Sequence, residues 1–230
     1  MQVVILCGGK GTRLSEYTQS IPKPMIEIGG KPILRHLMEF YANFGHKDFI
    51  LCLGYKGKKI IEYFKDTKDW NIEFVDTGED ANKAERLAKA KKKIKDDIFL
   101  LSYGDDLSDV DINRVIELHN KLDKIVTLTA VPLVSPFGIL ELNDDSEVTS
   151  FSEKPKLAHF MNGGFYAMKR GIFDYIKPGY DLEKEIFEEL VKLRQIAAFK
   201  HNGFWRSMNT LKDVVELNEL YDKGNAPWIK

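Results

Sequence analysis

Hydrophobic and polar positions in the first hundred residues follow two alternating patterns. Short apolar runs rich in Val, Ile and Leu predict strands at residues 3–7, 49–53, 72–76 and 98–102. Between these runs, apolar residues recur at helical spacing and predict helices at residues 32–44, 59–64 and 84–94. Strands and helices that alternate in this way are typical of βαβ units around a largely parallel sheet.

The pattern changes after a further helix, which is predicted at residues 111–122. Apolar runs then follow one another closely and predict strands at residues 125–133, 137–142, 148–153 and 163–168. We expect these strands to extend the sheet in mixed orientation. Helices are predicted again at residues 182–193 and 211–221, with a strand at 197–199 between them. Because no Ser/Pro/Gly-rich linker or internal repeat divides the chain, we predict a single α/β domain over residues 1–230.

Charge and cysteine usage limit the classes of partner. The chain has 34 Lys and Arg against 35 Asp and Glu, and this net charge of -1 gives no global field that would gather nucleic acid or an anionic membrane. An anionic ligand must therefore be held by local groups. Cys7 and Cys52 lack disulfide or metal-ligand spacing, so we interpret both as reduced core residues. Without an apolar run of about 18 residues or a basic leader, we expect a cytoplasmic protein.

A glycine-rich turn, Gly8–Leu14, follows the first predicted strand directly. Open α/β sheets bind ligands at the carboxyl ends of their strands, and glycines let successive backbone N–H groups approach anionic oxygens. Arg13 can add a forked cationic contact, so the turn suits a triphosphate. The spacing matches neither the dinucleotide fingerprint nor the P-loop. A tight corner without a ligand remains the alternative interpretation of the turn taken alone.

A second basic element, Pro22-Lys23-Pro24-Met25, lies shortly after the glycine turn. The two prolines restrict the backbone on both sides of Lys23 and would hold its ammonium group near the turn. A rigid loop with Lys23 in solvent is the alternative. Together, the glycine turn and the Pro-Lys-Pro-Met segment resemble the signature of the sugar-1-phosphate nucleotidyltransferase family.

The resemblance extends over nearly the whole chain and is strongest to the glucose-1-phosphate cytidylyltransferase branch of that family. The segments that carry it are Met25–Leu34, Gly54–Gly57, Val75–Gly78, Tyr103–Asp105, Glu153–Pro155, Asn162–Phe165, Gly203–Trp205 and Ala226–Trp228. The resemblance implies a Rossmann-like nucleotidyltransferase fold, α/β in class, with a largely parallel mixed central sheet flanked by helices. It also implies transfer of a nucleotidyl group, most simply CMP from CTP, to glucose 1-phosphate, with Mg²⁺ as cofactor, for nucleotide-sugar and polysaccharide synthesis.

Site residues carried over from the family fall into four groups. Those implied to be catalytic are Arg13, Lys23 and Asp105. Those implied to bind the nucleotide are Leu6, Gly8, Gly9, Gly11, Thr12, Arg13, Asp76, Thr77, Gly78 and Gly104. Those implied to bind the acceptor are Lys23, Glu153, Lys154, Asn162 and Gly163. The implied metal ligands are Asp105 and Asn209, and a homo-oligomer is expected. For Glu153 and Lys154, a surface ion pair is the alternative.

Three departures from the family pattern keep other functions open. Relatives have a longer insertion between the helix ending near Phe64 and the Val75–Gly78 turn, and a glycine pair where this chain has the segment Lys83–Arg86. Asn209 replaces an aspartate that would be the second metal ligand, and an amide oxygen lacks its charge. The alternatives are a different acceptor, such as another hexose or heptose 1-phosphate or a non-sugar phosphate, another nucleoside triphosphate, or a non-catalytic nucleotide-binding protein.

Overall fold

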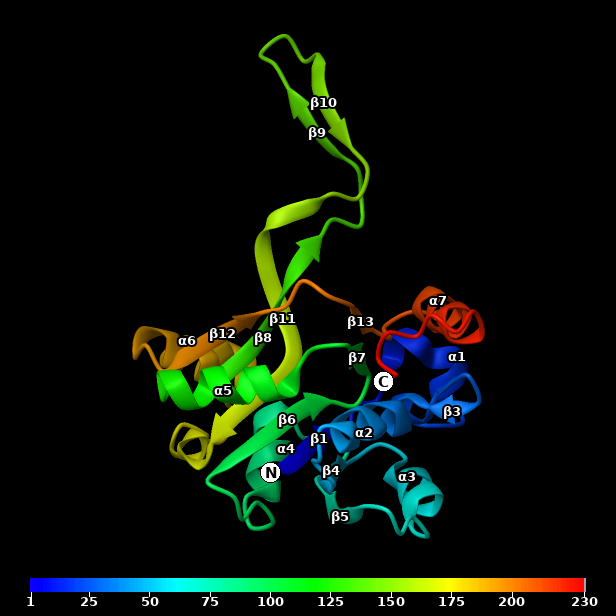
Figure 1. Ribbon diagram of the computed structural model, residues 1–230, viewed down its shortest axis with the longest axis vertical. Helices are drawn as coiled ribbons and strands as arrows, with labels where there is room; N and C mark the ends of the chain where they lie inside the picture. Colours follow the sequence, from blue (N-terminus) through cyan, green and yellow to red (C-terminus); the bar gives the residue numbers. More distant parts are fainter. Residues whose placement is uncertain (230) are drawn as a thin grey trace.

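A computed structural model describes residues 1–229 and is built around one seven-stranded sheet (Figure 1). In spatial order its strands are β12 (Ile196–Lys200), β8 (Val126–Val134), β11 (Lys156–Lys169), β6 (Ile98–Tyr103), β1 (Gln2–Leu6), β4 (Asp48–Leu53) and β5 (Asn71–Asp76). Four neighbouring pairs are parallel, and only β11 runs antiparallel to its neighbours, β6 and β8. The predicted α/β class with a largely parallel mixed sheet is confirmed.

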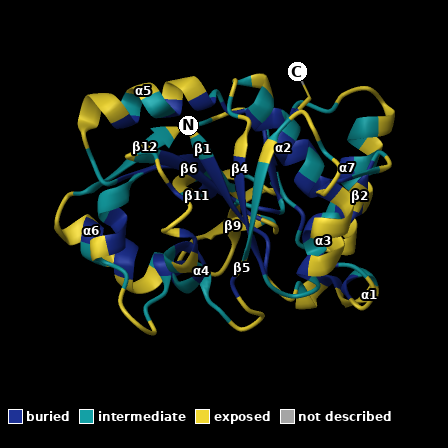
Figure 2. Ribbon diagram, turned by 90° about the horizontal axis from the view of Figure 1, so that it is seen from below, coloured by how far each residue is buried: buried dark blue, intermediate teal, exposed yellow. Residues whose placement is uncertain are grey.

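Helices cover both faces of the sheet (Figure 2). One face packs against α2 (Ile33–Asn43), α3 (Gly57–Phe64) and α5 (Ile112–Leu122), and the other against α4 (Lys83–Ala90) and α6 (Phe187–Lys192). Side chains of a strand point alternately to its two faces, so Val3 and Ile5 of β1 join the first core cluster and Val4 joins the second. A strand buried on both faces reads as a continuous apolar run, which is why β1, β4 and β6 were predicted from sequence.

A third packed layer brings the C-terminal helix α7 (Leu211–Asp222) against short segments near the N-terminus. The short elements are α1 (Ser15–Thr18), β2 (Glu27–Ile28), β3 (Lys31–Pro32), β7 (Asp106–Ser108) and β13 (Trp205–Ser207), together with 3-10 turns at Thr12–Leu14, Lys23–Met25 and Arg170–Asp174. Antiparallel pairing of β7 with β13 sets Asp106 opposite Ser207. Residues about a hundred positions apart thus meet beside the carboxyl end of β6.

The structure corrects one prediction about the second half of the chain. Two predicted strands, β9 (Ile139–Leu142) and β10 (Val148–Ser152), form a separate hairpin rather than an extension of the central sheet. We call this hairpin the arm, and Figure 1 shows it projecting well away from the rest of the molecule. A period of two in the sequence predicts a strand but does not name its partner, and here the two strands pair only with each other.

Several predicted boundaries also change. Helix α4 begins at an Asn82–Glu85 capping box and ends at Ala90, and a turn replaces the last predicted helical residues up to Ile94. Strand β11 begins at Lys156 rather than at residue 163. A π-helical turn, Leu182–Ile186, precedes α6. None of the helices in residues 1–229 combines the length and hydropathy needed to cross a bilayer.

Candidate active site

A cavity of about 560 Å³ opens at the carboxyl ends of β1 and β6. It lies where sequence reasoning placed the phosphate-binding turn. The residues that line it are Leu6, Cys7, Gly8, Gly9, Gly11, Thr12, Arg13, Lys23, Pro24, Ala81, Asn82, Lys83, Arg86, Tyr103, Gly104, Asp105, Asp106, Asn162, Asp181, Trp205, Ser207 and Asn209. The cavity therefore combines the predicted nucleotide loop, the predicted lysine and both predicted metal ligands.

Two glycines of the loop are required by their surroundings. Gly11 has a left-handed backbone with φ of +62°, and an added Cβ would lie 2.9 Å from both the Lys23 Cβ and the Thr18 Cγ2. A Cβ on Gly8 would lie only 1.9 Å from Nη1 of Arg86. Gly11 thus allows Lys23 to pack directly against the turn, and the solvent-exposed alternative for Lys23 is wrong. The loop backbone is held close to two cationic side chains.

Arg86 connects the glycine loop to the turn after β5. It is 5% exposed, and its guanidinium donates hydrogen bonds to the Gly8 carbonyl at 3.0 Å and the Gly78 carbonyl at 2.8 Å. It also donates to the Leu53 and Glu79 carbonyls and the Thr77 hydroxyl. Burial lowers the pKa of Arg86 from its ordinary value. Its neutral acceptors leave its positive charge available beneath the loop that is predicted to bind phosphates.

Lys23, Asp105 and Asn209 converge at one point of the cavity. The Lys23 ammonium forms an ion pair with Oδ2 of Asp105 and donates to Oδ1 of Asn209 at 3.0 Å. Asp105 follows β6 and Asn209 follows β13, so the tertiary fold alone brings them together. Both predicted metal ligands thus direct an oxygen atom toward the same cation, which in this structure is the ammonium group of Lys23.

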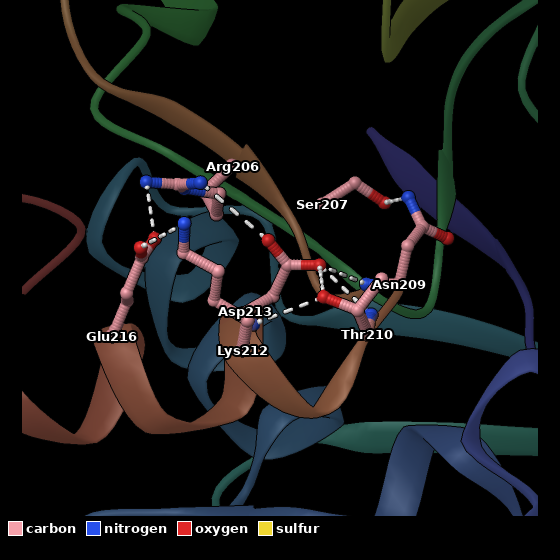
Figure 3. A network of polar contacts seen from close by, with 7 residues as sticks. All are labelled: Arg206, Ser207, Asn209, Thr210, Lys212, Asp213 and Glu216. Carbon is pink, nitrogen blue, oxygen red and sulfur yellow. Dashed lines mark hydrogen bonds and ion pairs between the residues drawn. The ribbon is translucent and has the colours of Figure 1, made fainter. Parts of the chain in front are cut away.

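The orientation of Asn209 is fixed by its neighbours (Figure 3). Its side-chain Nδ2 donates to the Ser207 hydroxyl at 3.0 Å, and its backbone N–H donates to Asp213 at 3.0 Å. Asp213 also forms a capping box with Thr210 at the start of α7. Because the amide nitrogen is engaged with Ser207, the amide oxygen is the atom that faces Lys23.

Asp106 is a buried carboxyl beside this cluster. Burial raises the pKa of Asp106 well above its ordinary value, and the adjacent Asp105 raises it further. The Ser207 hydroxyl and the ammonium groups of Lys23 and Lys83 act in the opposite direction. Its position in β7 opposite Ser207 places Asp106 in the cavity wall.

A chain of hydrogen bonds forms the wall of the cavity on the β6–β11 side. Asn162 donates from Nδ2 to the Tyr166 hydroxyl, which lies 2.7 Å from the Tyr103 hydroxyl. The Tyr103 hydroxyl donates to Oε1 of Glu183, and the Lys83 ammonium binds the same oxygen. Burial raises the pKa of both tyrosines, so both hydroxyl groups keep their protons.

Some predicted site residues do not line the cavity. Asp76, Thr77 and Gly78 lie behind Arg86, and Thr77 is fully buried. Gly163 accepts a hydrogen bond from Trp205 Nε1 at 2.7 Å, and Trp205 rather than Gly163 lines the cavity. Their predicted contacts with substrate stay predictions.

Glu153 and Lys154 also lie outside the cavity lining. They stand at the base of the arm, where their side chains are more than half exposed and lie 3.7 Å apart. Their assignment to the acceptor stays a prediction as well. Conversely, sequence reasoning missed Lys83, Arg86, Tyr103 and Asp106. The signal that could have identified Lys83 and Arg86 is their short distance along the sequence from the Asp76–Gly78 turn.

Comparison with known proteins places the chain among relatives. Residues 2–224 match the nucleotidyl transferase family. The chain belongs to that family. It is 40% identical to a probable glucose-1-phosphate cytidylyltransferase of Bacillus subtilis, with 99% of each chain covered, and 42% identical to the glucose-1-phosphate cytidylyltransferase of Salmonella typhimurium, with 99% of this chain and 98% of the other covered. The structure resembles that of HddC from Yersinia pseudotuberculosis complexed with GMP-PN, with a TM-score of 0.74 and 28% identity over 96% and 99% of the two chains.

The predicted family and enzyme class are thus confirmed. Nucleotidyltransferases of this family act on a nucleoside triphosphate and a sugar 1-phosphate and use a divalent metal ion. The alignment with the Bacillus relative spans 252 positions, although this chain has 230 residues. That difference fits the prediction that the relatives carry a longer insertion.

Proposed function

We propose that the protein transfers CMP from CTP to glucose 1-phosphate and releases CDP-glucose and pyrophosphate. An oxygen of the acceptor phosphate attacks the α-phosphorus of CTP, and the bond from that phosphorus to the β-phosphate oxygen breaks. The observation that carries the proposal is the meeting of Lys23, Asp105 and Asn209 beside the glycine loop. The names of two relatives, for which at least 98% of both chains is covered, support the choice of CTP and glucose 1-phosphate.

The residues of the cavity can carry this reaction by positioning and charge. The loop from Gly8 to Arg13 would hold the triphosphate, with the buried charge of Arg86 behind it. Lys23 would bind the acceptor phosphate and stabilise charge during attack. In-line displacement between two polyanions needs neutralisation and alignment more than a protein nucleophile. No covalent intermediate with the protein is therefore required.

Asp105 and Asn209 are the residues that would hold the metal, which we propose to be Mg²⁺. Both are oxygen ligands, both face one point, and Mg²⁺ commonly combines one or two carboxylates with substrate phosphates and waters. Within residues 1–229, no group of three or more His, Cys, Asp or Glu side chains is placed to hold a metal ion alone. When bound, Mg²⁺ would neutralise phosphate charge and help to orient the triphosphate.

The decisive experiment is a matrix of four nucleoside triphosphates against a panel of sugar 1-phosphates, measured as pyrophosphate release. CTP with glucose 1-phosphate should give the highest kcat/KM, and EDTA should abolish the signal. A higher kcat/KM for another pair would identify another acceptor or nucleotide. If no pair releases pyrophosphate, the chain is a non-catalytic nucleotide-binding protein.

We further propose that the protein acts as a homo-oligomer, as a single domain, without a nucleic-acid or membrane partner. One face of the arm supports association between copies, because it presents four apolar side chains to solvent: Leu140, Leu142, Val148 and Phe151. An isolated two-stranded hairpin is marginally stable in water, and a second copy would cover this face. Light scattering after size-exclusion chromatography tests this directly. A cytoplasmic location stays a prediction.

A further inference from the structure

A second Glu–Lys pair in this structure lies where the acceptor would be expected. The predicted acceptor pair, Glu153 and Lys154, is exposed at the base of the arm and does not line the cavity. Lys83 does line the cavity, and its ammonium forms an ion pair with Glu183. These two residues are a hundred positions apart and meet only because the π-helical turn Leu182–Ile186 packs beside the start of α4.

The surroundings of Lys83 fix its ammonium on the β6–β11 side of the cavity. The Lys83 Nζ lies 4.4 Å from the centre of the Tyr103 ring, in cation–π geometry, and Tyr103 donates to the same Glu183 oxygen. The chain of hydrogen bonds then continues through Tyr166 to Asn162, which is a predicted acceptor-binding residue. Lys83 therefore belongs to the same rigid network as Asn162.

Helix α4 contributes a cationic side chain to each of two sides of the cavity. Three residues after Lys83, Arg86 reaches the glycine loop and the turn after β5, which is the predicted nucleotide side. Lys83 reaches β6 and the π-helical turn instead. The two cations of α4 thus divide between the two predicted substrates.

Lys83 retains hydrogen-bonding capacity toward the cavity. An ammonium group has three N–H donors, and Glu183 Oε1 is its one hydrogen-bond partner within residues 1–229. The Lys83–Glu183 pair carries no net charge, so it suits a neutral, hydroxyl-bearing ring better than an additional anionic group. The acceptor phosphate has its own cation in Lys23.

We propose that Lys83 is a specificity-determining residue that donates a hydrogen bond to a ring hydroxyl of the acceptor, and that Glu183 is the positioning residue that holds it there. This inference rests on the proposed function, because it assumes a sugar 1-phosphate in the cavity. Within the segment in which this chain departs from its family, it assigns Lys83 to recognition of the acceptor and leaves Arg86 on the nucleotide side.

The test compares wild type with Lys83→Met, Lys83→Arg and Glu183→Gln, and it measures KM for each substrate at saturation of the other. Lys83→Met should lower kcat/KM for glucose 1-phosphate about 10-fold or more, because it removes a charged hydrogen bond, and should change the KM for CTP less than about 2-fold. Lys83→Arg should recover part of the loss. Glu183→Gln should raise the KM for glucose 1-phosphate in the same direction, with a smaller effect.

Lys91→Met is the matched control, since Lys91 lies 5.2 Å from the centre of the Phe173 ring and does not line the cavity. It should leave both KM values unchanged. Monodeoxy analogues of glucose 1-phosphate identify the contact. For the analogue that lacks the recognised hydroxyl, wild type and Lys83→Met should have equal kcat/KM, whereas the other analogues should retain the difference.

Three outcomes separate the possibilities. If wild type releases pyrophosphate and Lys83→Met shows no selective loss for the acceptor, the inference is wrong and the proposed function stands. An equal change in both KM values, with a matching fall in Tm, assigns Lys83 a structural role and also overturns it. If wild type releases no pyrophosphate with any pair, the proposed function fails and the inference fails with it.

Discussion

The cavity and the arm differ in how far the rest of the chain holds their side chains in place. Three cationic side chains of the cavity, Lys23, Lys83 and Arg86, are held by partners from other segments, as Arg86 is by the carbonyls of Gly8 and Gly78. The arm has only its own two strands, and Leu142 and Phe151 remain 60% and 62% exposed. We infer that substitutions in the cavity change the rate, whereas substitutions on the arm change association.

Asp105→Ala should have the largest effect and remove nearly all activity. Asp105 is the carboxylate that meets Lys23 beside Asn209, so of the two proposed Mg²⁺ ligands its loss leaves only the neutral oxygen of Asn209. Pyrophosphate release at saturating CTP and glucose 1-phosphate measures the effect. Substantial activity in this variant at ordinary Mg²⁺ concentration would show that the metal is held elsewhere.

Lys23→Ala and Arg13→Ala should each lower the rate by about 10²- to 10³-fold, since each removes a cation from a site of developing or bound charge. The two variants should separate by ligand. Lys23→Ala should mainly affect glucose 1-phosphate and kcat, and Arg13→Ala should mainly affect CTP. Full steady-state kinetics in both substrates checks this. Equal effects on both substrates would contradict the assigned roles.

Arg86→Lys tests whether the guanidinium holds the loop in place. An ammonium cannot reach the five acceptors of Arg86, and each buried acceptor left unpaired costs about 1–3 kcal/mol, so we expect destabilisation of about 2–4 kcal/mol. The KM for CTP should rise more than the KM for glucose 1-phosphate. Urea unfolding and kinetics measure both. Unchanged CTP binding in a folded variant would limit Arg86 to a structural role.

Asn209→Asp should have a smaller effect. It should lower the Mg²⁺ concentration that gives the half-maximal rate, because it adds a formal negative charge to the metal site. The surroundings oppose this gain. In the native chain Asn209 donates to the Ser207 hydroxyl, and Ser207 in turn bonds Asp106. In the variant, two carboxylates would share the single Ser207 proton. A Mg²⁺ titration of the rate decides, and a higher Mg²⁺ requirement would show that the amide is the better ligand here.

Phe151→Ser on the arm should have the smallest effect on the fold. Because the side chain is largely exposed, the free energy of unfolding of a single copy should change by no more than about 0.5 kcal/mol. The oligomer should dissociate at a higher protein concentration than wild type. Light scattering over a dilution series measures this, and Ser152→Ala, on the opposite face of the arm, is the control. An oligomer unaffected by Phe151→Ser would place the interface elsewhere.

Local sequence signals predicted the helices and strands whose own apolar pattern and capping residues specify them. The strands β1, β4, β5 and β6 were predicted to within one residue, because β1, β4 and β6 are short runs rich in apolar residues and β5 is a short run between two predicted helices. The helix after Asp111 was also predicted. In the structure Asp111 caps this helix, because its side chain accepts hydrogen bonds from the backbone N–H groups of Asn113 and Arg114. The arm was misplaced because alternation fixes a strand but not its neighbour.

The residues of the candidate site also fall into those that local sequence predicts and those that only tertiary contacts identify. Arg13, Lys23 and the glycine loop lie within one short segment, so their proximity could be predicted from spacing alone. Lys83 and Glu183 carry no local signal of their pairing, and Arg86 looks like one more cation on a charged helix. Only their hydrogen-bond partners, which lie up to a hundred positions away, distinguish them from surface residues.

By itself, the sequence determined the α/β class, the family and the phosphate-binding end of the sheet, because these depend on periodicity and on motifs contained in short segments. The tertiary structure alone decided that the oxygen of Asn209 faces Lys23, that Arg86 supports the glycine loop, and that Lys83 lies beside Tyr103. Those contacts join the residues after β13 to the Lys23–Met25 turn, α4 to the loop after β1, and α4 to β6. Packing of the helical layers sets these distances, and no pattern along the chain encodes them directly.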